Sequence, residues 1–133
     1  MTSPDPTSTE IQATALLVSR DLFFSSKITG TAAELGFRVA VEGDVAAAAA
    51  KAAHSTYRCI ILDLATPGLK VSDMVAALPA ANRPTVIAFG SHVDTARLNE
   101  AREAGCDEVM PRSKFSATLP EILTRTLRPE KIE

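Results

Sequence analysis

Short apolar segments alternate with longer stretches of helical character along most of the chain. The apolar segments cover 15–18, 37–41, 59–62, 86–89 and 108–110, and the helical stretches cover 21–35, 45–54, 72–78, 94–104 and 116–127. Segments such as CIIL and VIAF are apolar at every position, which predicts strands that are buried on both faces. Such strands are typical of a parallel sheet that is covered by helices.

The alternation amounts to five β-α units, and local signals support their ends. Gly36 and Gly105 follow two of the helical stretches, where glycine commonly ends a helix. With right-handed crossovers, five such units predict an α/β fold: a doubly wound five-stranded parallel sheet in the flavodoxin-like order 2-1-3-4-5, with helices on both faces. In this fold a crevice forms at the carboxyl ends of the central strands, where the strand order reverses.

Length and composition set the remaining bounds. The chain has 133 residues, which predicts a single domain at 13–128, a flexible tail at 1–12 and a short C-terminal tail at 129–133. A net charge of −2 gives no basic face for nucleic acid. Neither a membrane-spanning apolar run nor a secretory signal is visible, so we expect a cytoplasmic location and no membrane partner. Cys59 and Cys106 form no CxxC pair, which favours two reduced, packed thiols over a zinc site.

The charged residues that the fold brings to the crevice are the candidate site. Asp63 ends the third apolar segment, within RCIILDLATPG. The loops after the first and fourth strands should meet Asp63 there. Arg112, beyond the fifth strand, can reach the same opening of the crevice, which is called the mouth below. The loop residues are Ser19, Arg20 and Asp21 after the first strand, and Gly90 and Ser91 after the fourth.

Four segments in this order resemble the receiver domain of two-component response regulators. They are ALLVSRD, IILDLATPG, VIAFGS and AREAGCDEVMPR, and the resemblance covers roughly residues 14–127. It implies that Asp63 stands where receivers accept a phosphoryl group from a histidine kinase. It also implies an acidic pair for Mg²⁺ after the first strand, a hydroxyl after the fourth, an aromatic residue in the fifth and a lysine after it.

The chain departs from the receiver pattern at most of these positions. The acidic pair reads Ser19 and Arg20, and the lysine position reads Arg112. The hydroxyl position reads Gly90, with Ser91 one place later, and the aromatic position reads Val109. Since Gly90 offers no hydroxyl and Val109 no ring, we expect the module to be locked in one state, without the usual hydroxyl-aromatic coupling.

Charge at the mouth argues against a metal. Mg²⁺ takes near-octahedral oxygen ligands, and Arg20 would repel it, so we expect no Mg²⁺ and no other cofactor. Asp63 could instead form an ion pair with Arg20 or Arg112. Asp21 could restore an acidic site if the loop shifts by one residue, but its position favours a cap for the first helix.

Three functions are compatible with these residues. The first is a divergent stand-alone receiver that is not an enzyme and that signals by binding a protein, through the face formed by 94–127. The second is a receiver that still accepts phosphate on Asp63 from a histidine kinase. The third is a small phosphatase with an aspartate nucleophile, although that class wants a second acid where this chain has Ala65. Either a monomer or a homodimer is compatible with the sequence.

Overall fold

A five-stranded parallel sheet organises the chain, as predicted. The structure is a computed structural model that describes residues 14–54 and 56–128. Within them the strands lie in the order β2-β1-β3-β4-β5, and each neighbouring pair is parallel. The strands are β1 (Ala15–Val18), β2 (Val39–Glu42), β3 (Cys59–Asp63), β4 (Thr85–Gly90) and β5 (Glu108–Pro111).

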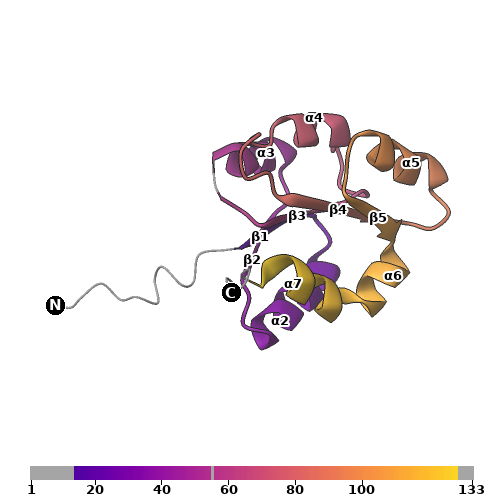
Figure 1. The fold of residues 1–133 in the computed structure, drawn as a ribbon. Coiled ribbons are helices and arrows are strands. Elements are labelled where there is room, and N and C mark those ends of the chain that lie inside the picture. The colour runs from indigo at the N-terminus through magenta and orange to yellow at the C-terminus, as the bar shows by residue number, and fades with distance from the viewer. Residues whose placement is uncertain (1–13, 55, 129–133) are drawn as a thin grey trace.

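Helices cover both faces of this sheet (Figure 1). One face carries α3 (Val45–His54), α4 (Val71–Ala76) and α5 (Thr95–Glu103), and the other carries α2 (Leu22–Glu34), α6 (Arg112–Ala117) and α7 (Leu119–Leu127). This is the doubly wound arrangement that the alternation of apolar and helical segments predicts.

The period of two along the strands divides the core into two layers. In β1, Leu17 faces the layer under α2 and α7, whereas Leu16 and Val18 face the layer under α3 and α5. The neighbouring β3 divides in the same way, and all five of its residues are buried. Strands that are apolar on both faces therefore have a packing partner on both, which is why no polar alternation appears in the sequence.

Several predicted boundaries differ from the structure by one or two residues, and two of the differences have a clear physical reason. The strand expected at 37–41 begins instead at Val39, because the Phe37 N–H donates to the Ala32 carbonyl at 2.8 Å and stays bound to the end of α2. The helix expected at 116–127 is two helices, α6 and α7. They are separated at Thr118, whose ψ of 15° leaves the helical range, just before a proline in the first turn of α7.

The predicted tails at 1–12 and 129–133 lie outside the described residues, so the domain limits stay predictions. Among the helices at 14–54 and 56–128, none is long and apolar enough to cross a membrane.

Two glycines at α2 provide a matched test of backbone conformation. Gly30 lies inside the helix, Gly36 lies just beyond it with φ of +86°, and a Cβ at either position would meet no atom within 4 Å. We expect Gly30→Ala to stabilise the fold by ~1 kcal/mol, because alanine favours helix. Gly36→Ala should destabilise it by ~1–2 kcal/mol, because the left-handed conformation is strained for alanine. Urea unfolding measures both, and equal effects would contradict this assignment.

Candidate functional site

Asp63 is a buried carboxylate at the carboxyl end of β3. It is only 2% exposed, and its Oδ2 accepts a hydrogen bond from Ser19 Oγ at 2.8 Å. Its Oδ1 accepts from the Ala65 backbone N–H at 3.0 Å and lies 3.7 Å from Arg112 Nη2. Both carboxylate oxygens therefore already have partners within the protein.

Arg112 is the cation of this site. It is the first residue of α6, and its Nη1 donates to Asp21 Oδ2 at 3.0 Å while Nη2 faces Asp63. The guanidinium carbon lies 4.7 Å from the centroid of the Phe24 ring and 5.5 Å from that of Phe89. One guanidinium thus bridges two carboxylates and rests on two aromatic rings, an arrangement that suits arginine better than lysine.

Those rings belong to an aromatic cluster on which the Arg112 guanidinium packs. Phe24 meets Phe89 edge-on with centroids 5.1 Å apart, and Phe89 stacks on Phe115 at 4.7 Å. Phe89 and Phe115 are fully buried. The cluster joins α2, β4 and α6, so the position of the guanidinium is fixed by the core and not only by its ion pairs.

Asp21 has two roles at the mouth. Its Oδ1 accepts from the Phe24 N–H at 2.9 Å and caps α2, as its position in the sequence favours. The Phe24 N–H and then Arg112 hold the pKa of Asp21 below its ordinary value. Without any shift of the loop, Asp21 and Asp63 come to face the same guanidinium.

Arg20 does not form the ion pair with Asp63 that the sequence left open. Its side chain is exposed, and within the described residues the cation beside Asp63 is Arg112. A Cβ on Gly43 would lie 3.0 Å from the Arg20 Cγ, so the stem of Arg20 packs over the β2–α3 loop. The Arg20 side chain turns toward this loop because the preceding residue, Ser19, already points into the crevice toward Asp63.

The side chains at the mouth do not fit a magnesium site. The two positions after β1 offer a serine hydroxyl and an exposed guanidinium in place of carboxylates. The two carboxylates that do approach one another are bridged by Arg112, and no cluster of three or more His, Cys, Asp or Glu side chains suited to a metal occurs in the described part of the chain. A divalent cation would have to displace the guanidinium before it could bind.

The switch positions are filled by packing. A Cβ on Gly90 would lie 3.2 Å from Leu64 Cδ1 and 3.3 Å from Leu64 Cβ, so Leu64 occupies the space beside the hydroxyl position. Ser91 is exposed, and its hydroxyl accepts from the Val93 N–H in its own loop. Val109 is half-buried against the core under α5.

Sequence reasoning missed two contributors to the site. Arg97 on α5 donates from Nη1 to the carbonyl of Leu64, the residue after Asp63. The aromatic cluster under Arg112 was also unforeseen. Its rings come from Phe24, Phe89 and Phe115, which share no local spacing in the sequence. Arg97, 33 residues away from Leu64, carried none.

The two thiols are poor nucleophiles. Burial raises the pKa of Cys59 to about 12 and that of Cys106 to about 11. Because the thiolate is the reactive form, both are inert near neutral pH.

Receiver domains are among the solved structures that share this arrangement of strands and helices. In comparisons with known proteins, no family model matches the sequence, and no curated protein matches it either. A response-regulator receiver domain from Bermanella marisrubri superposes with a TM-score of 0.73 and 21% identity, over 88% of this chain and all of the other. The receiver domain of a sensor histidine kinase from Pseudomonas aeruginosa, with magnesium coordinated in its active-site cleft, gives 0.72 and 23% identity over 86% of this chain and 97% of its own. The phosphorylated cyanobacterial phytochrome response regulator RcpA superposes with a TM-score of 0.72 and 15% identity, over 88% of this chain and 95% of its own.

The chain therefore has the fold of response-regulator receiver domains. Sequence identity to these three structures is only 15–23%, so the likeness establishes the fold alone.

Gly90→Thr tests whether Leu64 fills the switch position. We expect the substitution to destabilise the fold by ~1–3 kcal/mol, because the new side chain must displace Leu64. In the Leu64→Ala background the added cost should fall by ~1 kcal/mol or more, since the Cδ1 contact at 3.2 Å is removed while the Cβ contact at 3.3 Å remains. Urea unfolding of the four proteins gives this coupling. Ser91→Thr, exposed one residue later, is the control and should change stability by less than ~0.5 kcal/mol.

Arg112→Met tests the bridge through the pKa of Asp21. The pKa should rise toward, but stay below, the ordinary 3.8, because the Phe24 N–H remains. Since that pKa is depressed in the folded state, the interaction stabilises above 3.8 and is lost as the pH falls through the folded value. The difference in the free energy of unfolding between wild type and variant should become smaller at acid pH.

Carboxyl-carbon NMR titration of Asp21 gives the pKa, and urea unfolding at neutral and acid pH gives this difference. Arg125→Met is the matched control, because Arg125 pairs with Glu108 and leaves Asp21 untouched. An unchanged Asp21 titration in Arg112→Met would refute the bridge.

Proposed function

We propose that the chain is a divergent receiver that signals by binding a protein, is not an enzyme, and uses neither Mg²⁺ nor phosphorylation of Asp63. The observation that carries this proposal is the Arg112 guanidinium between Asp21 and Asp63. In this proposal the arginine acts as a permanent internal cation where receivers would bring a metal.

The partners of Asp63 support the absence of phosphoryl transfer. Hydrogen bonds and a neighbouring cation stabilise the negative charge of a carboxylate oxygen and so lower its reactivity toward phosphorus. Here Oδ2 accepts from Ser19, and Oδ1 accepts from Ala65 beside Arg112. Transfer also needs cations around the phosphoryl oxygens, and Arg112 is already engaged by Asp21.

The packing at the switch positions supports a module with one state. Two states require contacts that differ between them. Gly90 has no side chain that a phosphoryl group could draw inward, and Leu64 fills the space beside it. Val109 has no ring to turn. Regulation would then come from the amount of protein or from binding of a partner.

The proposed output face is the segment 94–127. It contains α5, the edge strand β5, α6 and α7, so it presents two helical layers on either side of one strand. A signalling protein is the proposed partner, with a histidine kinase as one candidate, and the cytoplasmic location expected from the sequence stays a prediction.

One observation favours a phosphorylatable receiver as a second candidate. Arg112 is 36% exposed in its side chain, so its guanidinium can be reached from solvent. If it turned from Asp21 toward an incoming phosphoryl group, it would supply part of the charge that a metal supplies elsewhere.

Mg²⁺ with beryllofluoride, a mimic of the acyl phosphate, distinguishes the two candidates. We expect the amide spectrum of the wild-type chain to show no saturable shift at Asp63, Val109 or α5. A Ser19→Asp/Arg20→Asp/Arg112→Lys variant restores the acidic pair and the lysine but not the hydroxyl or the aromatic residue, so it serves as the control that should respond at Asp63. After incubation with acetyl phosphate and Mg²⁺, the intact mass of the wild type should be unchanged.

Asp63→Asn is the specificity control. A wild-type response that spreads from Asp63 to Val109 and disappears in Asp63→Asn would establish the second candidate and refute the first.

A further inference from the structure

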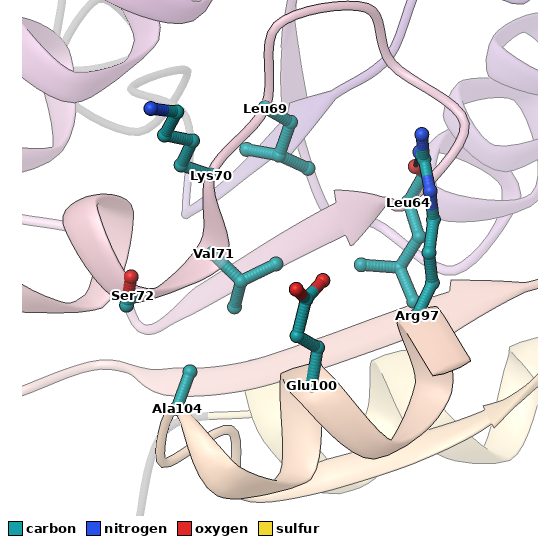
Figure 2. Close-up of a pocket in the computed structure, with 8 residues that line it drawn as sticks. All are labelled: Leu64, Leu69, Lys70, Val71, Ser72, Arg97, Glu100 and Ala104. Atoms are coloured by element: carbon teal, nitrogen blue, oxygen red, sulfur yellow. Dashed lines mark hydrogen bonds between the residues drawn. The ribbon is translucent and has the colours of Figure 1, made fainter. Parts of the chain in front are cut away.

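A second concave site lies between α4 and α5, one residue beyond Asp63. It is a cavity of about 310 Å³, at the small end of the range for ligand pockets. Its walls come from the β3–α4 loop on one side and from α5 on the other (Figure 2). Asp63, Asp21 and Arg112 do not line it, so it is separate from the site described above.

Opposite charges stand on one wall of this cavity. Arg97 and Glu100 are one helical turn apart on α5, and Figure 2 shows Glu100 pointing into the space below Leu69. Arg97 uses Nη1 on the Leu64 carbonyl and places Nε 3.5 Å from Asp94, not on Glu100. Among the described residues Glu100 forms no ion pair, so its carboxylate is available to a ligand.

The remaining walls are partly apolar and partly polar. Leu64, Leu69 and Val71 supply the apolar surface, on the β3–α4 side. Lys70 and Ser72 supply polar groups, but in Figure 2 the Lys70 ammonium points away from Glu100. The cavity thus offers one carboxylate, one guanidinium, one hydroxyl and an apolar surface.

We propose that this cavity binds a small apolar α-amino acid. The ammonium group would meet Glu100, the carboxylate would meet the Nη2 of Arg97, and the side chain would lie on Leu64, Leu69 and Val71. Each charged group of the ligand then gains a charge-assisted hydrogen bond, and the apolar side chain leaves water.

Leu64 connects this cavity to the Asp63 site. The same side chain that lines the cavity packs over Gly90, and its carbonyl accepts from Arg97. A ligand that contacts Leu64 and Arg97 therefore touches the segment that holds Asp63 and the Ala65 N–H. Binding should shift the amide signals of Asp63 and Ala65 as well as those of the cavity.

Titration of the full chain with L-leucine, followed by amide spectra, tests the proposal. We expect saturable shifts at Leu64, Leu69, Arg97 and Glu100. Two analogues test the need for both charges: 4-methylpentanoate lacks the ammonium group, and 3-methylbutan-1-amine lacks the carboxylate. Each should bind ~10-fold or more weakly, which corresponds to loss of one charge-assisted bond of ~1.5–3 kcal/mol.

Glu100→Gln should weaken leucine binding ~10-fold or more, for the same reason. Glu103→Gln is the matched control, because Glu103 is exposed on the same helix and does not line the cavity. No saturable shift with leucine, methionine or phenylalanine would overturn the proposal. Equal binding of the amine, or equal weakening by both glutamine variants, would overturn the assigned ligand class. None of these outcomes depends on whether Asp63 is phosphorylated.

Discussion

The guanidinium of Arg112 is the contact on which the site depends. It joins the carboxyl ends of three strands, because Asp21 follows β1, Asp63 ends β3 and Arg112 follows β5. Solvent screens the partly exposed pair with Asp21, whereas stacking on the aromatic rings adds ~0.5–2 kcal/mol. Asp63 is the buried partner, so loss of the cation would be felt more at Asp63 than at Asp21 despite the longer distance.

The other unusual residues of the mouth fit the burial of Asp63. A carboxylate at position 19 would repel Asp63, whereas the Ser19 hydroxyl donates to it at 2.8 Å. The serine and the Ala65 N–H share the negative charge with Arg112, which limits the cost of burying it. Hydroxyl, amide and guanidinium thus all face the carboxylate of Asp63.

The local sequence pattern was sufficient to predict the fold, but it did not predict the direction in which the side chains at the mouth point. The apolar runs and the glycines after two helices predicted the strand order and most boundaries. The sequence alone did not decide whether Arg20 or Arg112 is the partner of Asp63, because that depends on the direction in which the loop backbone turns each side chain. Adjacent residues of the loop point different ways, and Ser19 takes the inward direction. The short helix α6 was missed for a related reason: only Phe115 of its six residues is buried, so it has no readable period.

The same packing explains how α5 is attached to the acid site. Arg97 binds the carbonyl of Leu64, and the side chain of Leu64 fills the space beside Gly90. Leu64 is close-packed against Gly90, and interiors at crystal-like density resist small displacements. Leu64 and Arg97 also line the cavity between α4 and α5, so a ligand in that cavity would contact the segment that directly follows Asp63.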